Sequence, residues 1–84
     1  MNRLHVDVFL PGFGKTYEFL IDGNMTVGQA LERIINIIQD AENDMVTIDP
    51  GKAVLSDINI SSRLSADKTL RDAGVKSGHR LILV

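Results

Sequence analysis

Apolar and mostly polar positions alternate near the start of the chain. Leu4, Val6, Val8 and Leu10 fall on one side of an extended segment, and the residues between them fall on the other. A period of two is typical of a strand that is buried on one face. The pattern therefore predicts a strand over residues 3–10.

A turn and a second alternating segment follow. Residues 11–14 read Pro-Gly-Phe-Gly, which combines a fixed φ with two permissive positions and predicts a chain reversal. In residues 15–21 the more apolar alternate set is assigned to the core: Tyr17, Phe19 and Ile21. The two segments are expected to form an N-terminal hairpin.

The apolar spacing then changes from two to three and four. Thr26 stands three residues before Gln29, which is the spacing of a capping box at a helix start. The apolar positions that follow are Val27, Ala30, Leu31, Ile34, Ile35, Ile38 and Ala41. These positions predict a helix over about 26–40 whose apolar stripe covers one face of the hairpin.

The second half of the chain has a less regular pattern of apolar residues. Residues 45–48 and 53–55 flank a turn sequence at 49–52, so this part is either a small extra hairpin or an ordered loop. Residues 57–60 alternate as a short strand, and residues 63–65 are candidates for a brief edge strand. We expect Leu70 to anchor a single helical turn that Gly74 ends. The chain then turns into a central strand from Arg80 to Val84, with Leu81 and Leu83 facing inward.

This order of elements predicts an α+β fold: a four- to five-stranded mixed sheet with one helix across one face, in a single domain over residues 1–84. The closing stretch TLRDAGVKSGHRLILV resembles the terminal pattern of ubiquitin-like β-grasp proteins, at Leu70, Asp72, Gly78, Leu81 and Leu83. Within that class the chain is similar to the YukD/EsaB group, the small accessory proteins of type VII (WXG100) secretion systems of Gram-positive bacteria. The group is not known for a catalytic residue, so the resemblance implies none here.

Charge and composition exclude several kinds of partner. The formal net charge is −2 and the nine basic residues are scattered, so we expect no nucleic-acid binding. The chain has no cysteine, which removes disulfides and thiolate chemistry. No apolar run reaches the ~18–20 residues of a membrane span, and no signal peptide is recognisable at the start. We therefore expect a cytoplasmic protein without direct membrane insertion.

Three possible sites of chemistry are weak. Gly14-Lys15-Thr16 matches the end of a phosphate-binding loop, but Phe9 stands where that motif needs glycine, and a strand follows instead of a helix. The acidic residues 40, 42, 44 and 49 lack the spacing of a calcium loop. His5 and His79 are both expected at the surface. We therefore predict no enzyme activity, no cofactor and no metal site.

Binding to another protein is the function that these patterns favour. In ubiquitin-like modifiers and sulfur carriers, a flexible tail ending in two glycines is adenylated, whereas this chain ends in Leu83-Val84. The resemblance therefore disfavours the alternative of a modifier or sulfur carrier, and a generic ubiquitin-like regulatory domain remains as another alternative.

The candidate contact residues are those expected on the outer face of the sheet: His5, Phe9, Leu20, Arg80, Ile82 and Val84. Apolar residues gathered in this way would form a patch, and such patches mark partner sites. The resemblance implies a component of the secretion machinery as the partner. The edge strand at 15–21 would also allow homo-oligomers, although nothing requires them.

Overall fold

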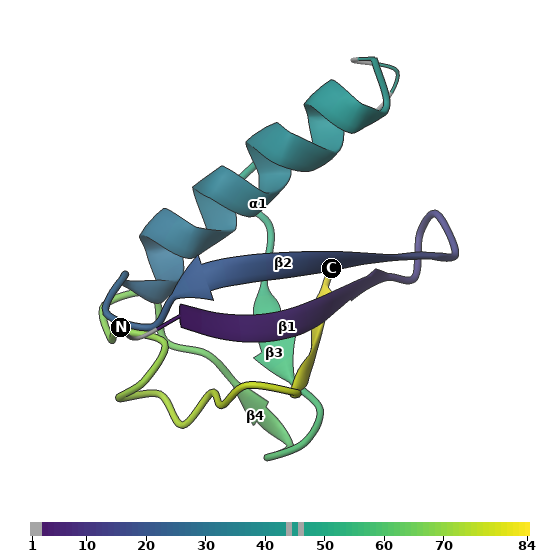
Figure 1. The fold of residues 1–84 in the computed structure, drawn as a ribbon. Coiled ribbons are helices and arrows are strands. Elements are labelled where there is room, and N and C mark those ends of the chain that lie inside the picture. The colour runs from purple at the N-terminus through teal and green to yellow at the C-terminus, as the bar shows by residue number, and fades with distance from the viewer. Residues whose placement is uncertain (1–2, 44, 46) are drawn as a thin grey trace.

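The computed structural model describes residues 3–43, 45 and 47–84. The elements in chain order are β1 (Arg3–Leu10), β2 (Lys15–Asp22), α1 (Val27–Ala41), β3 (Leu55–Asp57), β4 (Ser62–Arg63) and β5 (Arg80–Leu83) (Figure 1). The strands form one five-stranded sheet in the order β2-β1-β5-β3-β4. The predicted mixed sheet with one helix is therefore confirmed.

The closing strand β5 is central, as its apolar sequence predicts. It lies between β1 and β3, parallel to the first and antiparallel to the second. Its inward residues Leu81 and Leu83 are buried, at 0% and 4% exposure. Since β1 and β2 pair antiparallel along their full length, the last strand joins the N-terminal hairpin to β3 and β4.

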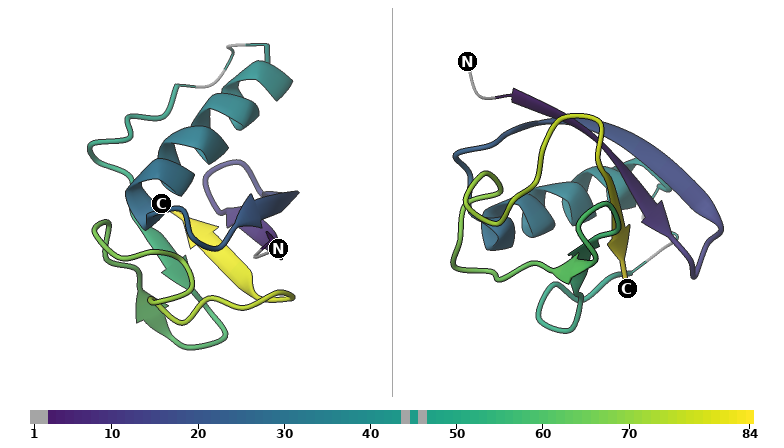
Figure 2. Two further views of the ribbon diagram at one scale, coloured as in Figure 1. Left: turned by 60° about the vertical axis from the view of Figure 1, so that its left-hand side comes forward. Right: turned by 90° about the horizontal axis from the view of Figure 1, so that it is seen from below.

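The helix begins where the capping box predicts. Thr26 is the N-cap, and its Oγ1 accepts a hydrogen bond from the Gln29 N–H at 3.1 Å, while Gln29 Oε1 accepts one from the Thr26 N–H at 3.1 Å. These reciprocal bonds satisfy donors that the first helical turn would otherwise leave unpaired. Figure 2 shows α1 on one side of the sheet.

Two more donors of the first turn bind a distant segment. The Val27 N–H donates to Lys68 O at 2.8 Å, and the Gly28 N–H donates to Ala66 O at 3.1 Å. A Cβ on Gly28 would lie 3.4 Å from the same Ala66 oxygen. Glycine therefore suits this close approach between the first turn of α1 and the segment that follows β4.

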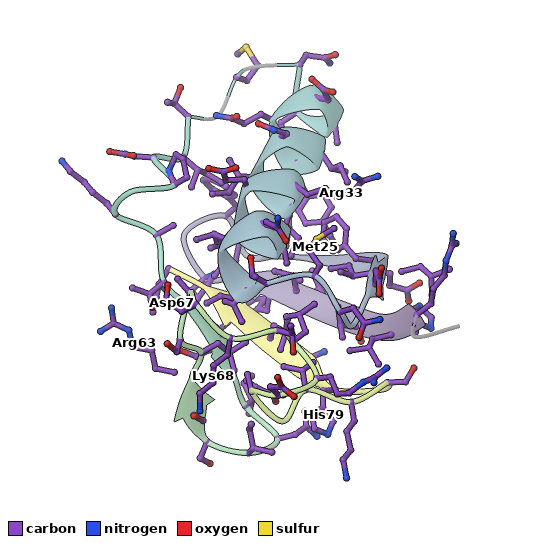
Figure 3. All side chains as sticks on the ribbon, turned by 90° about the vertical axis from the view of Figure 1, so that its left-hand side faces the viewer. Met25, Arg33, Arg63, Asp67, Lys68 and His79 are labelled. Atoms are coloured by element: carbon purple, nitrogen blue, oxygen red, sulfur yellow. The ribbon has the colours of Figure 1, made fainter. Side chains whose placement is uncertain are left out.

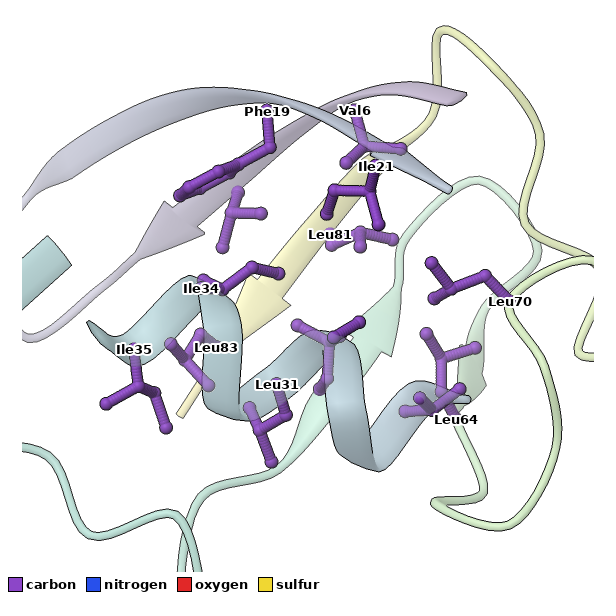
Figure 4. Packing of buried hydrophobic residues seen from close by; sticks show 14 of the residues in the cluster. Val6, Phe19, Ile21, Leu31, Ile34, Ile35, Leu64, Leu70, Leu81 and Leu83 are labelled. Atoms are coloured by element: carbon purple, nitrogen blue, oxygen red, sulfur yellow. The ribbon is translucent and has the colours of Figure 1, made fainter. Parts of the chain in front are cut away.

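The core lies between α1 and the inner face of the sheet (Figure 4). The fully or nearly fully buried apolar residues come from α1, from β1, β2, β3 and β5, and from the segment between β4 and β5: Val6, Val8, Leu10, Phe19, Ile21, Val27, Ala30, Leu31, Ile34, Ile35, Ile38, Leu55, Leu64, Leu70, Val75, Leu81 and Leu83. The inward residues expected for β1, β2 and β5 belong to this core or pack against it. Over the described residues, no helix has the length and apolar character to cross a bilayer.

The region from residue 45 to 54 is a loop wherever the structure describes it, so the extra hairpin is not formed there. Val46, which belongs to one of its expected strands, lies outside the described residues. The strand predicted at 57–60 is wrong, because β3 ends at Asp57 and the Ser61 N–H bonds to Ile58 O in a turn. The alternation of polar and apolar residues over 57–60 gave a wrong prediction because burial is reversed there. Asp57 is buried, whereas Ile58 and Ile60 are 45% and 40% exposed.

The segment before β5 turns twice, as expected. The Ala73 N–H bonds to Thr69 O at 2.9 Å, which closes a single helical turn around the buried Leu70. Gly74 and Gly78 then adopt φ values of 96° and 91°, a region that favours glycine. These two reversals bring the chain into β5.

Candidate functional site

The outer face of the sheet is the face opposite α1 (Figure 2). Alternation places these side chains on it: His5, Asp7 and Phe9 from β1, Thr16, Glu18 and Leu20 from β2, and Arg80 and Ile82 from β5. The predicted contact residues of these three strands are therefore on one face. Their positions along the strands decide which of them lie together.

Phe9 and Ile82 are neighbours. They are opposite each other in the register of the parallel pair β1 and β5, and both are partly exposed. Ser56 of β3 is the next residue in the same row, since it pairs with Ile82. One end of the outer face therefore carries an aromatic and a branched aliphatic side chain beside a small polar one.

Leu20 and His5 form a second pair, which is separate from the first. They are opposite each other in the antiparallel register of β1 and β2. Leu20 is 61% exposed. His5 Nε2 lies 3.8 Å from Glu18 Oε2, and both side chains are well exposed.

A polar row separates the two pairs. Asp7 is opposite Glu18 on β2 and opposite Arg80 on β5, so three charged side chains cross the face between the pairs. Alternation indicates the face on which a residue lies, but the turns and loops set how far one strand is offset from the next. Of the residues expected in a single patch, Phe9 and Ile82 consequently lie at one end, His5 and Leu20 at the other, and Arg80 in the charged row between them.

Val84 extends the Phe9 and Ile82 end. It is 65% exposed, and its N–H and C=O both bond to Val54, at 3.0 and 2.7 Å. Val84 also borders an apolar cavity of about 290 Å³, which is lined by Leu10, Gly12, Phe13, Ile48, Leu83 and Val84. The sequence reasoning missed Phe13 and Ile48, although a phenylalanine inside a Pro-Gly-Phe-Gly turn is a signal of an exposed aromatic.

The expectation for His79 is wrong. Its side chain is 16% exposed, and its Nδ1 lies 2.7 Å from Oδ2 of Asp57, which is fully buried. A carboxylate only accepts hydrogen bonds, so Nδ1 donates the proton. The Lys76 N–H, 3.3 Å from the same nitrogen, therefore has no acceptor there. Because a buried carboxylate needs a donor, this pair holds β3 to the start of β5.

Glu42, one of the acidic residues after the helix, bonds to side chains of β2. Glu42 is the C-cap of α1, and its Oε1 accepts hydrogen bonds from the Tyr17 hydroxyl and from Lys15 Nζ, the latter at 2.9 Å. The bond from Tyr17, followed by that from Lys15, lowers the pKa of Glu42. The same bonds to Glu42 raise the pKa of Tyr17 and that of Lys15. This cluster fastens the end of the helix to the start of β2.

Lys15 begins strand β2, so no helix follows the Gly-Lys-Thr sequence, as expected. Asp44 lies outside the described residues. Within the ranges that the structure covers, no three His, Asp or Glu side chains are grouped so as to hold a metal ion.

Solved structures with this fold are ubiquitin-like. An N-terminal ubiquitin-like domain solved in solution superposes with a TM-score of 0.77 at 18% identity, over 99% of this chain and 74% of that chain. The ubiquitin-like domain of an Arabidopsis thaliana protein superposes with a TM-score of 0.76 at 18% identity, over 100% of this chain and 78% of that chain. The ubiquitin of Caldiarchaeum subterraneum superposes with a TM-score of 0.74 at 20% identity, over 96% of this chain and 90% of that chain. At these identities the likeness shows the fold.

Comparison at the level of sequence is more specific. No curated protein matches the chain significantly. The family model described as "WXG100 protein secretion system (Wss), protein YukD" matches residues 3–83. Because this match spans nearly the whole sequence, the chain belongs to the YukD family.

Proposed function

We propose that this protein is a non-catalytic, cytoplasmic accessory component of a bacterial type VII (WXG100) secretion system. It binds a protein of that machinery through the outer face of its sheet. Membership of the YukD family supports the connection with secretion. The observation that carries the binding mode is the apolar end of the outer face, where Phe9 and Ile82 are adjacent.

This end of the face has the properties of a contact surface. Val84 and Phe13 add exposed apolar area, at 65% and 40% exposure, and they border the cavity of about 290 Å³ described above. A cavity of this size and apolar lining fits one bulky apolar side chain of a partner. Removal of such surface from water contributes about 25 cal/mol per Å². The charged row of Asp7, Glu18 and Arg80 then forms a polar rim on one side.

The titratable contacts in the described residues support a non-catalytic role. Asp57 and His79 bond to each other across two strands, and Glu42 bonds to two residues of β2. Each of these groups therefore has a structural partner. Asp57, His79 and Glu42 are therefore not free to act as general acids or bases on a substrate.

A secretion assay tests this proposal. The gene is deleted from the organism that encodes the chain, and export of a WXG100 substrate is measured by immunoblot after complementation. We expect wild type to restore export, and Phe9→Asp/Ile82→Asp to lower it about tenfold, because two charges would enter the apolar contact. The matched control Ile37→Asp/Met45→Asp changes two exposed apolar residues away from the sheet and should restore export.

Two outcomes would count against the proposal. Unchanged export after deletion would remove the connection with secretion. Full restoration by Phe9→Asp/Ile82→Asp would remove the outer face as the binding surface. Because Phe9 and Ile82 are partly buried, the variant's cellular level and its amide spectrum are compared with those of wild type first.

A further inference from the structure

β2 forms one edge of the sheet. The strand order is β2-β1-β5-β3-β4, so among the described strands β1 alone pairs with it. This edge is eight residues long, whereas β4 at the opposite edge has two residues. Natural sheets commonly shorten, bend or cover their edges, because free backbone groups pair with other chains. The long β2 edge is therefore open to such pairing wherever its outward backbone groups are free.

The bonds between β1 and β5 show which way the backbone of β1 faces. His5 O accepts a bond from the Gly78 N–H at 2.7 Å, and the Asp7 N–H donates to His79 O at 3.2 Å. Backbone groups of successive residues in a strand point to opposite sides. The odd-numbered residues of β1 therefore face β5, and the even-numbered residues face β2.

The same alternation fixes the free groups of β2. Val6 is opposite Phe19, so β2 bonds to β1 through its odd-numbered residues. Thr16, Glu18 and Leu20 consequently direct their N–H and C=O groups away from the sheet. Among the described residues, no turn or loop bonds to these six groups.

A cavity of about 250 Å³ lies beside one end of this edge. It is lined by Arg3, Leu20, Ile21, Asp22, Met25 and Arg33. Figure 3 shows Met25 and Arg33 next to each other on one side of the molecule. Over the described part of the chain, neither Arg3 nor Arg33 forms a salt bridge. Asp22 is the one carboxylate in the lining, and its Oδ1 accepts a bond from the Asn24 N–H at 2.9 Å.

We propose that the β2 edge is a second binding site, which accepts an extended acidic segment of a partner protein as an additional strand. The backbone of the segment bonds to Thr16, Glu18 and Leu20. Its apolar side chains cover Leu20 and Met25, and its carboxylate lies between Arg3 and Arg33, which outnumber Asp22 in the cavity lining. Strand addition of this kind obtains affinity from main-chain bonds and specificity from alternate side chains.

The charges favour a partner peptide over a second copy of this chain. Two β2 edges that pair antiparallel around Glu18 would place the two Glu18 carboxylates opposite each other, and opposed like charges are destabilising. An acidic residue of a partner near Leu20 would instead lie beside the guanidinium groups of Arg3 and Arg33, neither of which forms a salt bridge within the described part of the chain. This site is also separate from the Phe9 and Ile82 end of the outer face, so it does not depend on the function proposed above.

Amide hydrogen exchange of the full chain, followed by NMR, tests the site. The probe is a blocked nonapeptide of alternating valine and threonine with two aspartates at one end, and the control peptide carries two lysines in their place. With the aspartate peptide we expect exchange at Thr16, Glu18 and Leu20 to slow about tenfold, since their N–H groups become bonded. Exchange at Tyr17 and Phe19 should be slow with and without peptide, because these residues already bond to β1.

Two substitutions at one position separate the edge from the rest of the fold. Glu18→Pro removes an outward N–H and leaves the bonds to β1 in place, as proline is tolerated in an edge strand at such a position. Glu18→Ala keeps the N–H, and both variants lose the contact with His5. Peptide affinity should fall about tenfold in Glu18→Pro and change little in Glu18→Ala. Arg3→Gln/Arg33→Gln should lower the affinity for the aspartate peptide about fivefold.

Several results would overturn the proposal. These are unchanged exchange at Thr16, Glu18 and Leu20 with the aspartate peptide, equal binding of the lysine peptide, or undiminished binding by Glu18→Pro. Slow exchange at Tyr17 and Phe19 in the free variant shows that Glu18→Pro is folded. Protection that appears without peptide as the protein concentration rises would identify a second copy as the occupant, and so would also contradict the proposal.

Discussion

A buried carboxylate joins two parts of the chain that are far apart in sequence. Asp57 is 0% exposed, its Oδ2 lies 2.7 Å from His79 Nδ1, and its Oδ1 accepts a bond from the Asn59 N–H at 2.9 Å. Asn59 Oδ1 in turn accepts a bond from the Arg80 N–H at 2.8 Å. The turn after β3 and the start of β5 are therefore held by the same group of polar side chains.

Removal of the imidazole would leave that carboxylate buried without its donor. We expect His79→Ala to lower the free energy of unfolding by about 3 kcal/mol, measured by urea denaturation at pH 7. Asp57→Ala/His79→Ala should cost less than the sum of the two single substitutions, because the second change removes the unpaired charge. The control His5→Ala alters an exposed histidine and should change stability by less than about 0.5 kcal/mol. Equal, small effects of His79→Ala and His5→Ala would contradict a structural role for the pair.

The pattern of residues along a strand predicts which face of the sheet a side chain lies on better than it predicts which side chain it contacts. The period of two in β1 and β2 correctly identifies the inward face, whose residues are buried except for the partly buried Leu4 and Tyr17. The position of His79 could not be found in this way, because its partner Asp57 is 22 residues away. The end of β3 at Asp57 was also not predictable from the pattern, because polar residues are usually exposed and this aspartate is buried.

At the scale of elements, the two ends of α1 are fixed by different means. The start depends on the Thr26 and Gln29 capping box, which is visible in the sequence, and on backbone acceptors of residues 66 and 68. The end depends on Glu42, which bonds to Lys15 and Tyr17 of β2. The sequence predicts the local cap but not the contacts that span more than 20 residues.

The contact at the end of α1 makes stability depend on pH. Hydrogen bonds from Tyr17 and Lys15 lower the pKa of Glu42, so its ionised form stabilises the folded state. This stabilisation is present above the ordinary carboxyl pKa of 4.5 and is lost as pH falls through the lowered pKa. Between pH 6 and pH 3, we expect Glu42→Gln to lose less stability than wild type in urea denaturation. Glu32→Gln, an exposed control on the same helix, should follow wild type; an identical pH profile for Glu42→Gln would disprove the stabilising contact.

At the scale of the whole molecule, the order of the elements and the central place of β5 follow from the sequence. The candidate surface follows only in part. Its residues are on the expected face, but the strand register divides them into the Phe9 and Ile82 row and the His5 and Leu20 row. Register depends on turns and on pairings across the whole chain, so a one-dimensional pattern does not contain it. The cavity next to Val84 likewise needs Phe13 and Ile48 from separate loops.

The central claim is that the Phe9 and Ile82 end of the outer face contacts the secretion machinery. Methyl cross-saturation NMR tests it most directly, with the methyl-labelled chain bound to purified cytoplasmic domains of the machinery from the same organism. We predict intensity loss at the methyl groups of Ile82 and Val84 and none at Ile37, an exposed isoleucine on α1. Intensity loss at Ile37 with unchanged signals from Ile82 and Val84 would contradict the claim.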